Sequence, residues 1–304
     1  MRRERLIAGS LDKVVNRFGI GAGNPSAGMK IVIAGAAKSG TTALYYALKQ
    51  SLPRSYAHKF EPKSYVSNPS EDKVLAKIII NSVERIEDFD CFDKRIYLIR
   101  DPRDIVVSGV LYRIYNAREP IDQDVLDYYL RGIEQKQRDP ASISVIELQK
   151  RLSPLLRLES HADHHRERTA MAFGSEHPEY FVYQYEDLIA GRFGELEKYL
   201  GFPITFSGDV DAKHQRVARA KEAGGWRDWF TPADVKYYRP LFQDFLTKYD
   251  YELDWTLNPN PRITAEHSTV YVRRMLAEGQ TARRKAKSGL RARFKSWRHS
   301  LRKS

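Results

Sequence analysis

A short run near the start of the chain combines residue types that can bind phosphate. An apolar segment leads into Lys38, Ser39, Gly40, Thr41 and Thr42, and apolar residues at helical spacing follow. A glycine-containing turn between a strand and a helix directs several backbone N–H groups to one point. The amino end of the helix adds about half a positive charge there. We therefore predict that this turn binds a phosphate group.

The glycine spacing matches that of the ATP-binding loop G-x-x-x-x-G-K-[ST], but the lysine has moved. Thr41 follows Gly40, where that loop has its lysine, and Lys38 lies two residues before Gly40. The lysine would therefore reach a different phosphate oxygen, and its usual pairing with a Mg²⁺-binding hydroxyl is not expected. We predict a nucleotide phosphate site that works without a metal ion. The alternative is a glycine-containing turn that binds nothing.

A second pair of residues could bind another phosphate. Arg100 ends an apolar segment, and Ser108 lies eight residues later in the segment that follows. An arginine fork and a hydroxyl at that separation could grip one phosphate together. In the alternative, Arg100 pairs with Asp101 or Asp104, and Ser108 only allows helices to approach each other.

Both groups of residues lie where predicted strands end. Strands are predicted within the apolar or β-branched segments 30–34, 54–65, 73–80, 95–99 and 180–185. Helices are predicted from Thr41 to about Ser51, from Pro102 with Asp101 as N-cap, and within 121–172, 193–200 and 231–249. This alternation predicts an α/β protein of the P-loop type, with a central parallel sheet flanked by helices in three layers. Ligands of such sheets gather at the carboxyl ends of the strands.

Charge divides the chain into three predicted regions. The 304 residues have a net charge of +12, and residues 260–304 hold thirteen lysines and arginines but only two acidic residues. We predict a basic N-terminal segment with a linker over 1–28, a main domain over 29–259 and a basic tail over 260–304. The one cysteine, Cys91, allows no internal disulfide, which fits a reducing, cytoplasmic location.

The two phosphate-binding groups and two further blocks resemble the sulfotransferase family, whose donor is 3′-phosphoadenosine 5′-phosphosulfate (PAPS). One further block is YEDL, which begins at Tyr185, and the other runs from Arg219 through Gly224 and Gly225 to Trp226. The four blocks occur in the order of that family over roughly residues 29–255.

The resemblance implies a role for each block. The turn at 38–42 would hold the 5′-phosphosulfate, with Lys38 stabilising charge on the sulfuryl and leaving groups. Arg100 and Ser108 would hold the 3′-phosphate, and 3′,5′-adenosine bisphosphate (PAP) would be the product. The remaining predicted cofactor-binding residues are Tyr185, Arg219, Gly224, Gly225 and Trp226. No metal is expected, and His161, His164 and His165 are interpreted as surface residues.

The departures from the family pattern favour the carbohydrate sulfotransferases over the cytosolic phenol and steroid enzymes. Ala43 stands where the cytosolic enzymes have a tryptophan, and the run at 77–79 lacks their catalytic histidine. Residues 59–65 loosely match a K-E-P-like segment that carries a catalytic glutamate in the carbohydrate enzymes. We therefore predict Glu61 as general base, with His58 as the alternative because imidazole titrates near neutral pH.

Glu61 also has a purely structural interpretation. It lies between Lys59 and Lys63 and could be a solvated loop carboxylate paired with either one.

The C-terminal tail has the pattern of a helix on an anionic membrane surface. Leu290, Phe294, Trp297 and Leu301 recur at spacings of four, three and four, with arginine and lysine between them. We predict peripheral contact with the cytoplasmic face of a membrane, and hence a carbohydrate or glycolipid acceptor. A polyanion-binding arm and a solvated tail are the alternatives, and no specific nucleic-acid partner is expected.

Two other functions compete with the sulfotransferase hypothesis. The first is a P-loop nucleotide kinase, against which Thr41 in place of the lysine counts. The second is a non-enzymatic protein that binds membranes or polyanions through its tail and carries a degenerate nucleotide-binding fold.

Overall fold

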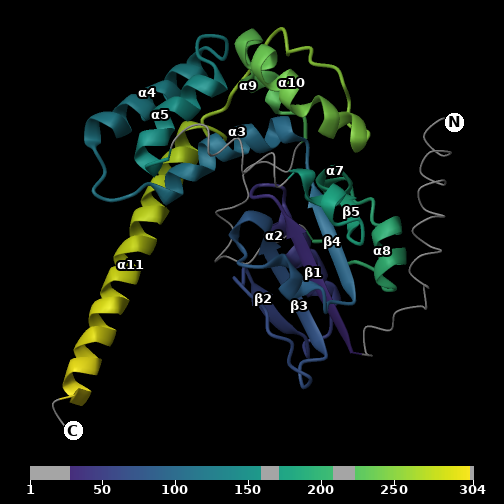
Figure 1. Cartoon of the computed structure of the whole chain (residues 1–304). Helices are drawn as coiled ribbons and strands as arrows, with labels where there is room; N and C mark the ends of the chain where they lie inside the picture. Colours follow the sequence, from purple (N-terminus) through teal and green to yellow (C-terminus); the bar gives the residue numbers. More distant parts are fainter. Residues whose placement is uncertain (1–27, 159–170, 208–222, 302–304) are drawn as a thin grey trace, which may run out of the picture. The chain divides into compact units, whose positions relative to one another are not determined.

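The computed structural model describes residues 28–158, 171–207 and 223–301, with the backbone alone for 289–301. These residues form two compact units (Figure 1). The first unit contains 28–36, 40–99 and 173–207, and the second contains 37–39, 100–158, 171–172 and 223–301. The predicted main domain, 29–259, therefore contributes to both units.

The first unit is built on a parallel sheet, as predicted. Within the described residues the sheet has five strands in the order β2-β3-β1-β4-β5. All its neighbouring strands pair in parallel, and their bounds are β1 (Met29–Gly35), β2 (Ala57–Phe60), β3 (Lys73–Ile79), β4 (Lys94–Ile99) and β5 (Phe181–Gln184). Ile31 and Ile33 on one face of β1 and Val32 on the other are fully buried. A strand covered on both faces needs such a continuous β-branched run.

Helix α2 (Thr41–Ser51) belongs to the layer over one face of this sheet. Leu44 and Leu48 of α2 pack with Ile31 and Ile33 of β1 in one apolar cluster. The other elements of the first unit are α7 (Tyr185–Ile189), α8 (Gly194–Leu200) and the 3-10 helices η1 (Ile80–Ser82) and η2 (Ile86–Phe89). The predicted α/β class, with helices flanking a central parallel sheet, is confirmed.

The second unit is helical. Its elements are α3 (Pro102–Tyr112), η3 (Arg113–Asn116), α4 (Gln123–Arg138), α5 (Val145–Leu156), α9 (Trp226–Trp229), α10 (Pro232–Lys248) and α11 (Thr269–Leu301). The predicted N-cap Asp101 accepts a hydrogen bond from the backbone N–H of Arg103, and Thr231 and Asp234 form a capping box at α10. The segment predicted helical over 121–172 is interrupted after Arg138, and its part at 159–170 lies outside the described residues.

The first part of the region predicted as a basic tail, 260–304, packs in the core of the second unit. Ile263, Tyr271, Val272 and Met275 are buried in the same apolar cluster as Trp226. A Cβ at Gly279 would overlap the carbonyl oxygen of Tyr115, so α11 lies directly against η3. The predicted boundary at 259 therefore does not coincide with the end of tertiary packing.

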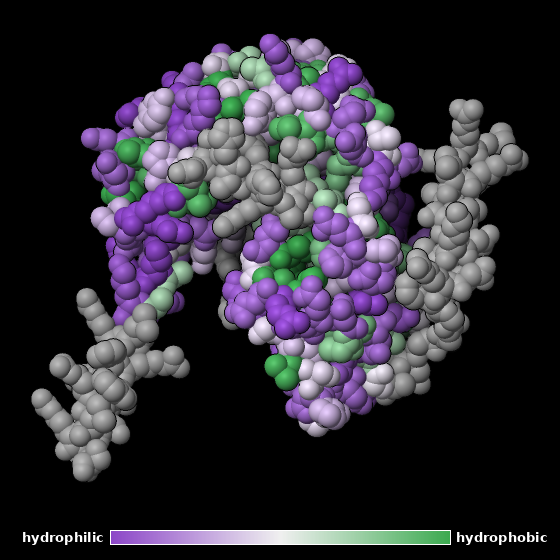
Figure 2. All heavy atoms as spheres, viewed as in Figure 1, coloured by the Kyte–Doolittle hydropathy of each residue, from purple (hydrophilic) through white to green (hydrophobic). Residues whose placement is uncertain are grey.

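Beyond these contacts α11 continues as one helix (Figure 1). Residues 284–288 are exposed, and Figure 2 shows this stretch as mostly hydrophilic. The backbone is helical up to Leu301, as predicted for the tail. None of the helices that the structure describes is both long and apolar enough to span a membrane.

Candidate functional site

In the first unit, the amino end of α2 offers unused positive potential. Its N-cap is Gly40, which has no side chain to accept from the first-turn amides, and the first turn contains no acidic residue. Thr41 and Thr42, the first two residues of the helix, are buried. Within the described part of the chain, no side chain caps this helix start, a feature that suits an anion site.

The ring of Tyr185 packs directly against Gly40 in this turn. Gly40 has φ of 100°, and a Cβ placed on it would overlap the ring of Tyr185. Tyr185 is buried at the start of α7, directly after β5. Only glycine satisfies both conditions, the left-handed backbone and the close approach of the ring. The predicted binding residue Tyr185 thus fixes the course of the loop.

The preceding residues of the loop belong to the second unit. Lys38 has φ of 71°, and its Nζ lies 3.8 Å from the centre of the Tyr112 ring. Its carbonyl oxygen accepts a hydrogen bond from Nη1 of Arg100 at 3.4 Å. Ser39 is completely buried, yet its hydroxyl has no hydrogen-bond partner among the described residues. A buried hydroxyl in that state favours a ligand that supplies the missing partner.

Arg100 lies just before α3, and Ser108 lies within that helix. Arg100, Asp104 and Ser108 are spaced four residues apart, and all three are buried. Nη2 of Arg100 lies 3.8 Å from Oδ2 of Asp104, so the ion pair considered as an alternative does form. That distance is longer than a hydrogen bond, so the contact is an ion pair only.

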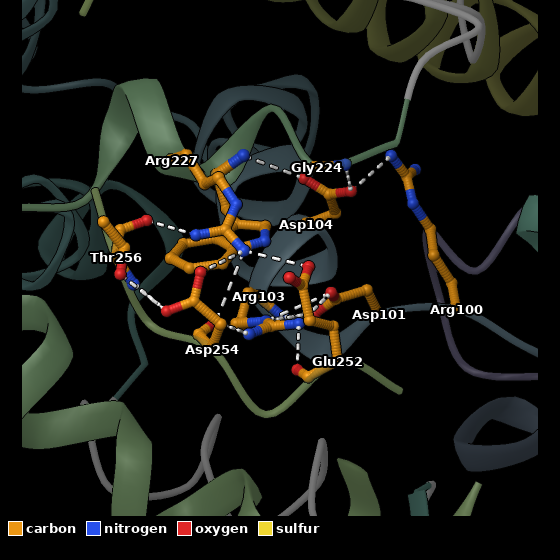
Figure 3. Close-up of polar contacts among 10 residues, drawn as sticks. Arg100, Asp101, Arg103, Asp104, Gly224, Arg227, Glu252, Asp254 and Thr256 are labelled. Atoms are coloured by element: carbon orange, nitrogen blue, oxygen red, sulfur yellow. Dashed lines mark hydrogen bonds and ion pairs between the residues drawn. The ribbon is translucent and has the colours of Figure 1, made fainter. Parts of the chain in front are cut away.

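Asp104 joins the second block to the third, a role that the sequence analysis did not predict (Figure 3). Its Oδ2 accepts from the backbone N–H of Gly224 at 2.8 Å, and its Oδ1 accepts from that of Trp226 at 3.0 Å. Burial raises the pKa of the Asp104 carboxyl, while Arg100 and the two backbone N–H groups act in the opposite direction. The only signal in the sequence was an acidic residue four positions after Arg100.

Trp226 itself is held by Arg103. The guanidinium of Arg103 lies 4.3 Å from the centre of the Trp226 ring and donates to both carboxylate oxygens of Asp101. It also donates to the carbonyl oxygens of Glu252 and Asp254, each at 3.0 Å. The indole of Trp226 is 1% exposed, so its side chain is part of the core. Arg219, the first residue of this block, lies outside the described residues.

The general-base candidates are in the first unit. The Glu61 side chain pairs with Nζ of Lys77, which is 1% exposed, and its backbone N–H donates to the Lys77 carbonyl oxygen at 2.8 Å. In place of the local pairs considered as the alternative interpretation of Glu61, Lys59 pairs with Glu71 and Lys63 donates to the carbonyl oxygen of Ser82. Lys77, at the carboxyl end of β3, is therefore a further residue of this region that the sequence analysis did not identify.

His58 lies on the edge strand β2. Its ring makes an edge contact with Tyr45 of α2, with the ring centres 6.1 Å apart. Partial burial, with a smaller contribution from Lys49, lowers the pKa of His58. A histidine that is neutral at pH 7 can accept a proton, so His58 keeps its place as the alternative base.

The predicted absence of a metal stays a prediction. His161, His164 and His165 lie outside the described residues. Among the described residues, no three or more His, Cys, Asp or Glu side chains are grouped so that they could hold a metal ion.

Comparisons with known proteins give similarities to solved structures only. No family model matches the chain, and no curated protein matches it. Among the solved structures that match is mouse sulfotransferase SULT7A1 complexed with PAP, at 15% identity and a TM-score of 0.42. The match covers 73% of this chain and 86% of that one. At these values the similarity does not assign an activity.

Proposed function

We propose that this protein is a sulfotransferase that moves a sulfuryl group from PAPS to an acceptor hydroxyl. One observation carries the proposal. Arg100, predicted to bind the 3′-phosphate, donates to the backbone of Lys38 in the loop predicted to bind the 5′-phosphosulfate. These residues are 62 positions apart, so the contact supports one ligand with two phosphate-bearing ends.

The residues suit the charges of PAPS at both ends. The first-turn amides of α2 and the hydroxyls of Thr41 and Thr42 would bind the 5′-phosphate, and Ser39 would gain a partner there. The ammonium of Lys38 would leave the Tyr112 ring to neutralise charge on the sulfuryl oxygens. Arg100 would bind the 3′-phosphate as a guanidinium fork, with Ser108 assisting.

The reaction needs a base and a stabilised leaving group. The acceptor oxygen forms a bond to sulfur while the bond from sulfur to the 5′-phosphate oxygen breaks, and its electron pair leaves with PAP. The acceptor proton passes to Glu61, or to His58 in the alternative. Positioning and electrostatic stabilisation would supply most of the acceleration, as in phosphoryl transfer. A kinase is not favoured, because Thr41 stands at the position of the P-loop lysine.

The basic tail supports a carbohydrate or glycolipid acceptor at an anionic membrane surface. Residues 284–303 contain nine lysines and arginines and no acidic residue. A continuous helix over 269–301 that is anchored in the second unit would present this charge to phosphate headgroups. This part of the proposal rests on the tail alone, and deletion of 289–304 should weaken binding to anionic vesicles without changing PAP affinity.

The proposed activity is tested by calorimetric binding of PAP without Mg²⁺. Wild type should bind, and Arg100→Ala should weaken binding by about a hundredfold, because a charge-assisted fork to phosphate is lost. Arg95→Ala is the matched control, since Arg95 lies on β4, the strand that Arg100 follows, and pairs with Asp90 and Glu179 instead. Absence of PAP binding to folded wild type, or equal loss in both variants, would contradict the proposal. If wild type binds PAP and only Arg100→Ala loses binding, turnover of PAPS with panels of carbohydrate and glycolipid acceptors would identify the acceptor.

A further inference from the structure

The Asp104 carboxylate is shared between two of the predicted binding blocks. It faces Arg100 on one side and binds the backbone of Gly224 and Trp226 on the other. We propose that Asp104 is a positioning residue that couples occupancy of the 3′-phosphate site to the conformation of residues 224–226. This inference rests on the proposed function, because it takes the ligand of Arg100 to be the 3′-phosphate of PAPS.

Asp104 makes one ion pair without a hydrogen bond and two ordinary hydrogen bonds. Its bonds from the N–H groups of Gly224 and Trp226, at 2.8 and 3.0 Å, have ordinary hydrogen-bond lengths. Its contact with Arg100, at 3.8 Å, is an ion pair without a hydrogen bond. A phosphate that engages Arg100 can therefore share this cation without first breaking a hydrogen bond to Asp104.

Because Asp104 is buried, sharing the charge of Arg100 with a phosphate should alter the other contacts of the Asp104 carboxylate. The Asp104 side chain is 2% exposed, and the charged side chains that act on it are Arg100, which favours its ionised form, and Asp101, which opposes it. When a phosphate draws on the Arg100 charge, the buried carboxylate must rely more on the two backbone N–H groups. Residues 224–226 should then become more rigid. By linkage, rigid 224–226 should favour phosphate binding at Arg100 to the same degree.

Asp104 is not the sole contact that holds Trp226. Arg103 already covers the Trp226 ring and ties it to the backbone of Glu252 and Asp254. The separate contacts of Arg103 and Asp104 allow the coupling role to be tested apart from folding.

Hydrogen exchange of the Gly224 and Trp226 amides in full-length wild type gives the direct test. Saturating PAP should slow their exchange at least about tenfold, whereas saturating 5′-AMP, which lacks the 3′-phosphate, should not. Equal protection by both nucleotides would overturn the coupling. This arm needs no substitution, so it can overturn the coupling even where a variant does not fold.

Asp104→Asn provides the second arm. It keeps the size of the side chain, removes its charge, and should weaken PAP binding by about ten- to a hundredfold while PAP no longer slows exchange at 224 and 226. Asp234→Asn is the matched control, because Asp234 is also buried in the second unit and accepts from backbone N–H groups, those of Val145, Ile146 and Thr231. Asp234→Asn should lower stability without changing the PAP affinity of the folded protein.

The outcomes separate this inference from the proposed function. If wild type binds PAP, Arg100→Ala loses binding and folded Asp104→Asn binds as wild type does, the coupling is wrong and the sulfotransferase proposal stands. If wild type does not bind PAP, both are wrong.

Discussion

The turns that follow β1 and β4 both lead from a buried parallel strand into a helix, but their electrostatics differ. The first turn of α2 is capped by a glycine and contains no acidic residue. The first turn of α3 is capped by Asp101 and contains Asp104, which accepts from two backbone N–H groups of the chain. Among the described residues, no side chain caps the start of α2, whereas α3 has an aspartate as N-cap and another aspartate in its first turn.

The comparison teaches that two helix starts that each follow a parallel strand can differ in their suitability for an anion, because one carries acidic side chains and the other does not. At α2 we expect the backbone to bind phosphate directly. At α3 a phosphate would meet two acidic side chains, so the positive charge must come from the side chain of Arg100. Four experiments can change or measure this difference in charge between the starts of α2 and α3.

The largest expected effect comes from removing the charge of Asp101, the N-cap of α3, while Asp104 keeps its own. Asp101→Asn preserves the N-cap, because asparagine caps helices as well as aspartate does, but it removes the charge partner of buried Arg103. We expect a loss of about 3 to 5 kcal/mol in the free energy of unfolding. Urea unfolding measures this loss, and the PAP affinity of the folded fraction should hardly change. A large loss of PAP affinity with intact stability would mean that Asp101, and not only Asp104, serves the binding site.

Closing the open turn of α2 comes next. Gly40→Ala forces alanine into φ of 100° and its Cβ into the Tyr185 ring, and we expect a cost of about 2 to 4 kcal/mol together with loss of PAP binding. Gly191→Ala is the control, since Gly191 has φ of 69° but open space around it, and it should cost only about 1 kcal/mol. Equal costs in the two variants would show that the Tyr185 contact is unimportant.

A smaller change should make α2 resemble α3. Ala43→Glu places a carboxylate in the first turn of α2. Its attraction to the positive end of the helix dipole should raise the free energy of unfolding by about 0.3 to 1 kcal/mol. The same charge should weaken PAP binding by about tenfold through repulsion of the 5′-phosphate. Thermal unfolding and calorimetry measure the two opposite effects. Ala43→Gln, of similar size but uncharged, should change neither by much, and tighter PAP binding in the glutamate variant would refute an anion site here.

The smallest effect is a pH dependence that arises at α3. The pKa of Asp104 is raised above its ordinary value of 3.8, so the folded state holds this proton more tightly than the unfolded state. The Asp104 contribution to the free energy of unfolding should therefore fall as the pH rises from 3.8 through the raised pKa. Urea unfolding across this pH window compares wild type with Asp104→Asn, which lacks the decline. A difference that grows in favour of wild type with rising pH would contradict the assignment.

Local sequence signals predicted the elements and the turns. The β-branched run of β1, the glycine at position 40 and the Asp101-Pro102 start of α3 each act within a few residues, and the structure confirms the strand, the turn and the cap. The PAPS-binding roles of Lys38, Arg100 and Ser108 follow from motif order and stay predictions.

The charge partners were not predictable in the same way. Lys59 and Lys63 flank Glu61 in the sequence, but the strand pairing of β2 with β3 brings it to Lys77 instead. Asp104 meets the backbone of Gly224, 120 residues away, and no local pattern indicates that contact. The start of the tail was missed for a related reason, since its first helical turns are basic in composition yet bury Tyr271 and Met275 against the second unit.

The sequence by itself determined where strands and helices begin and which turns could hold phosphate, because these depend on backbone preferences and on hydrophobic periodicity over short distances. Only the tertiary structure decided the long-range contacts of the ionisable side chains. Glu61 meets Lys77 of the neighbouring strand, Arg103 meets the backbone of Glu252, and Asp104 meets the backbone of Trp226, because the chain topology brings these distant residues together.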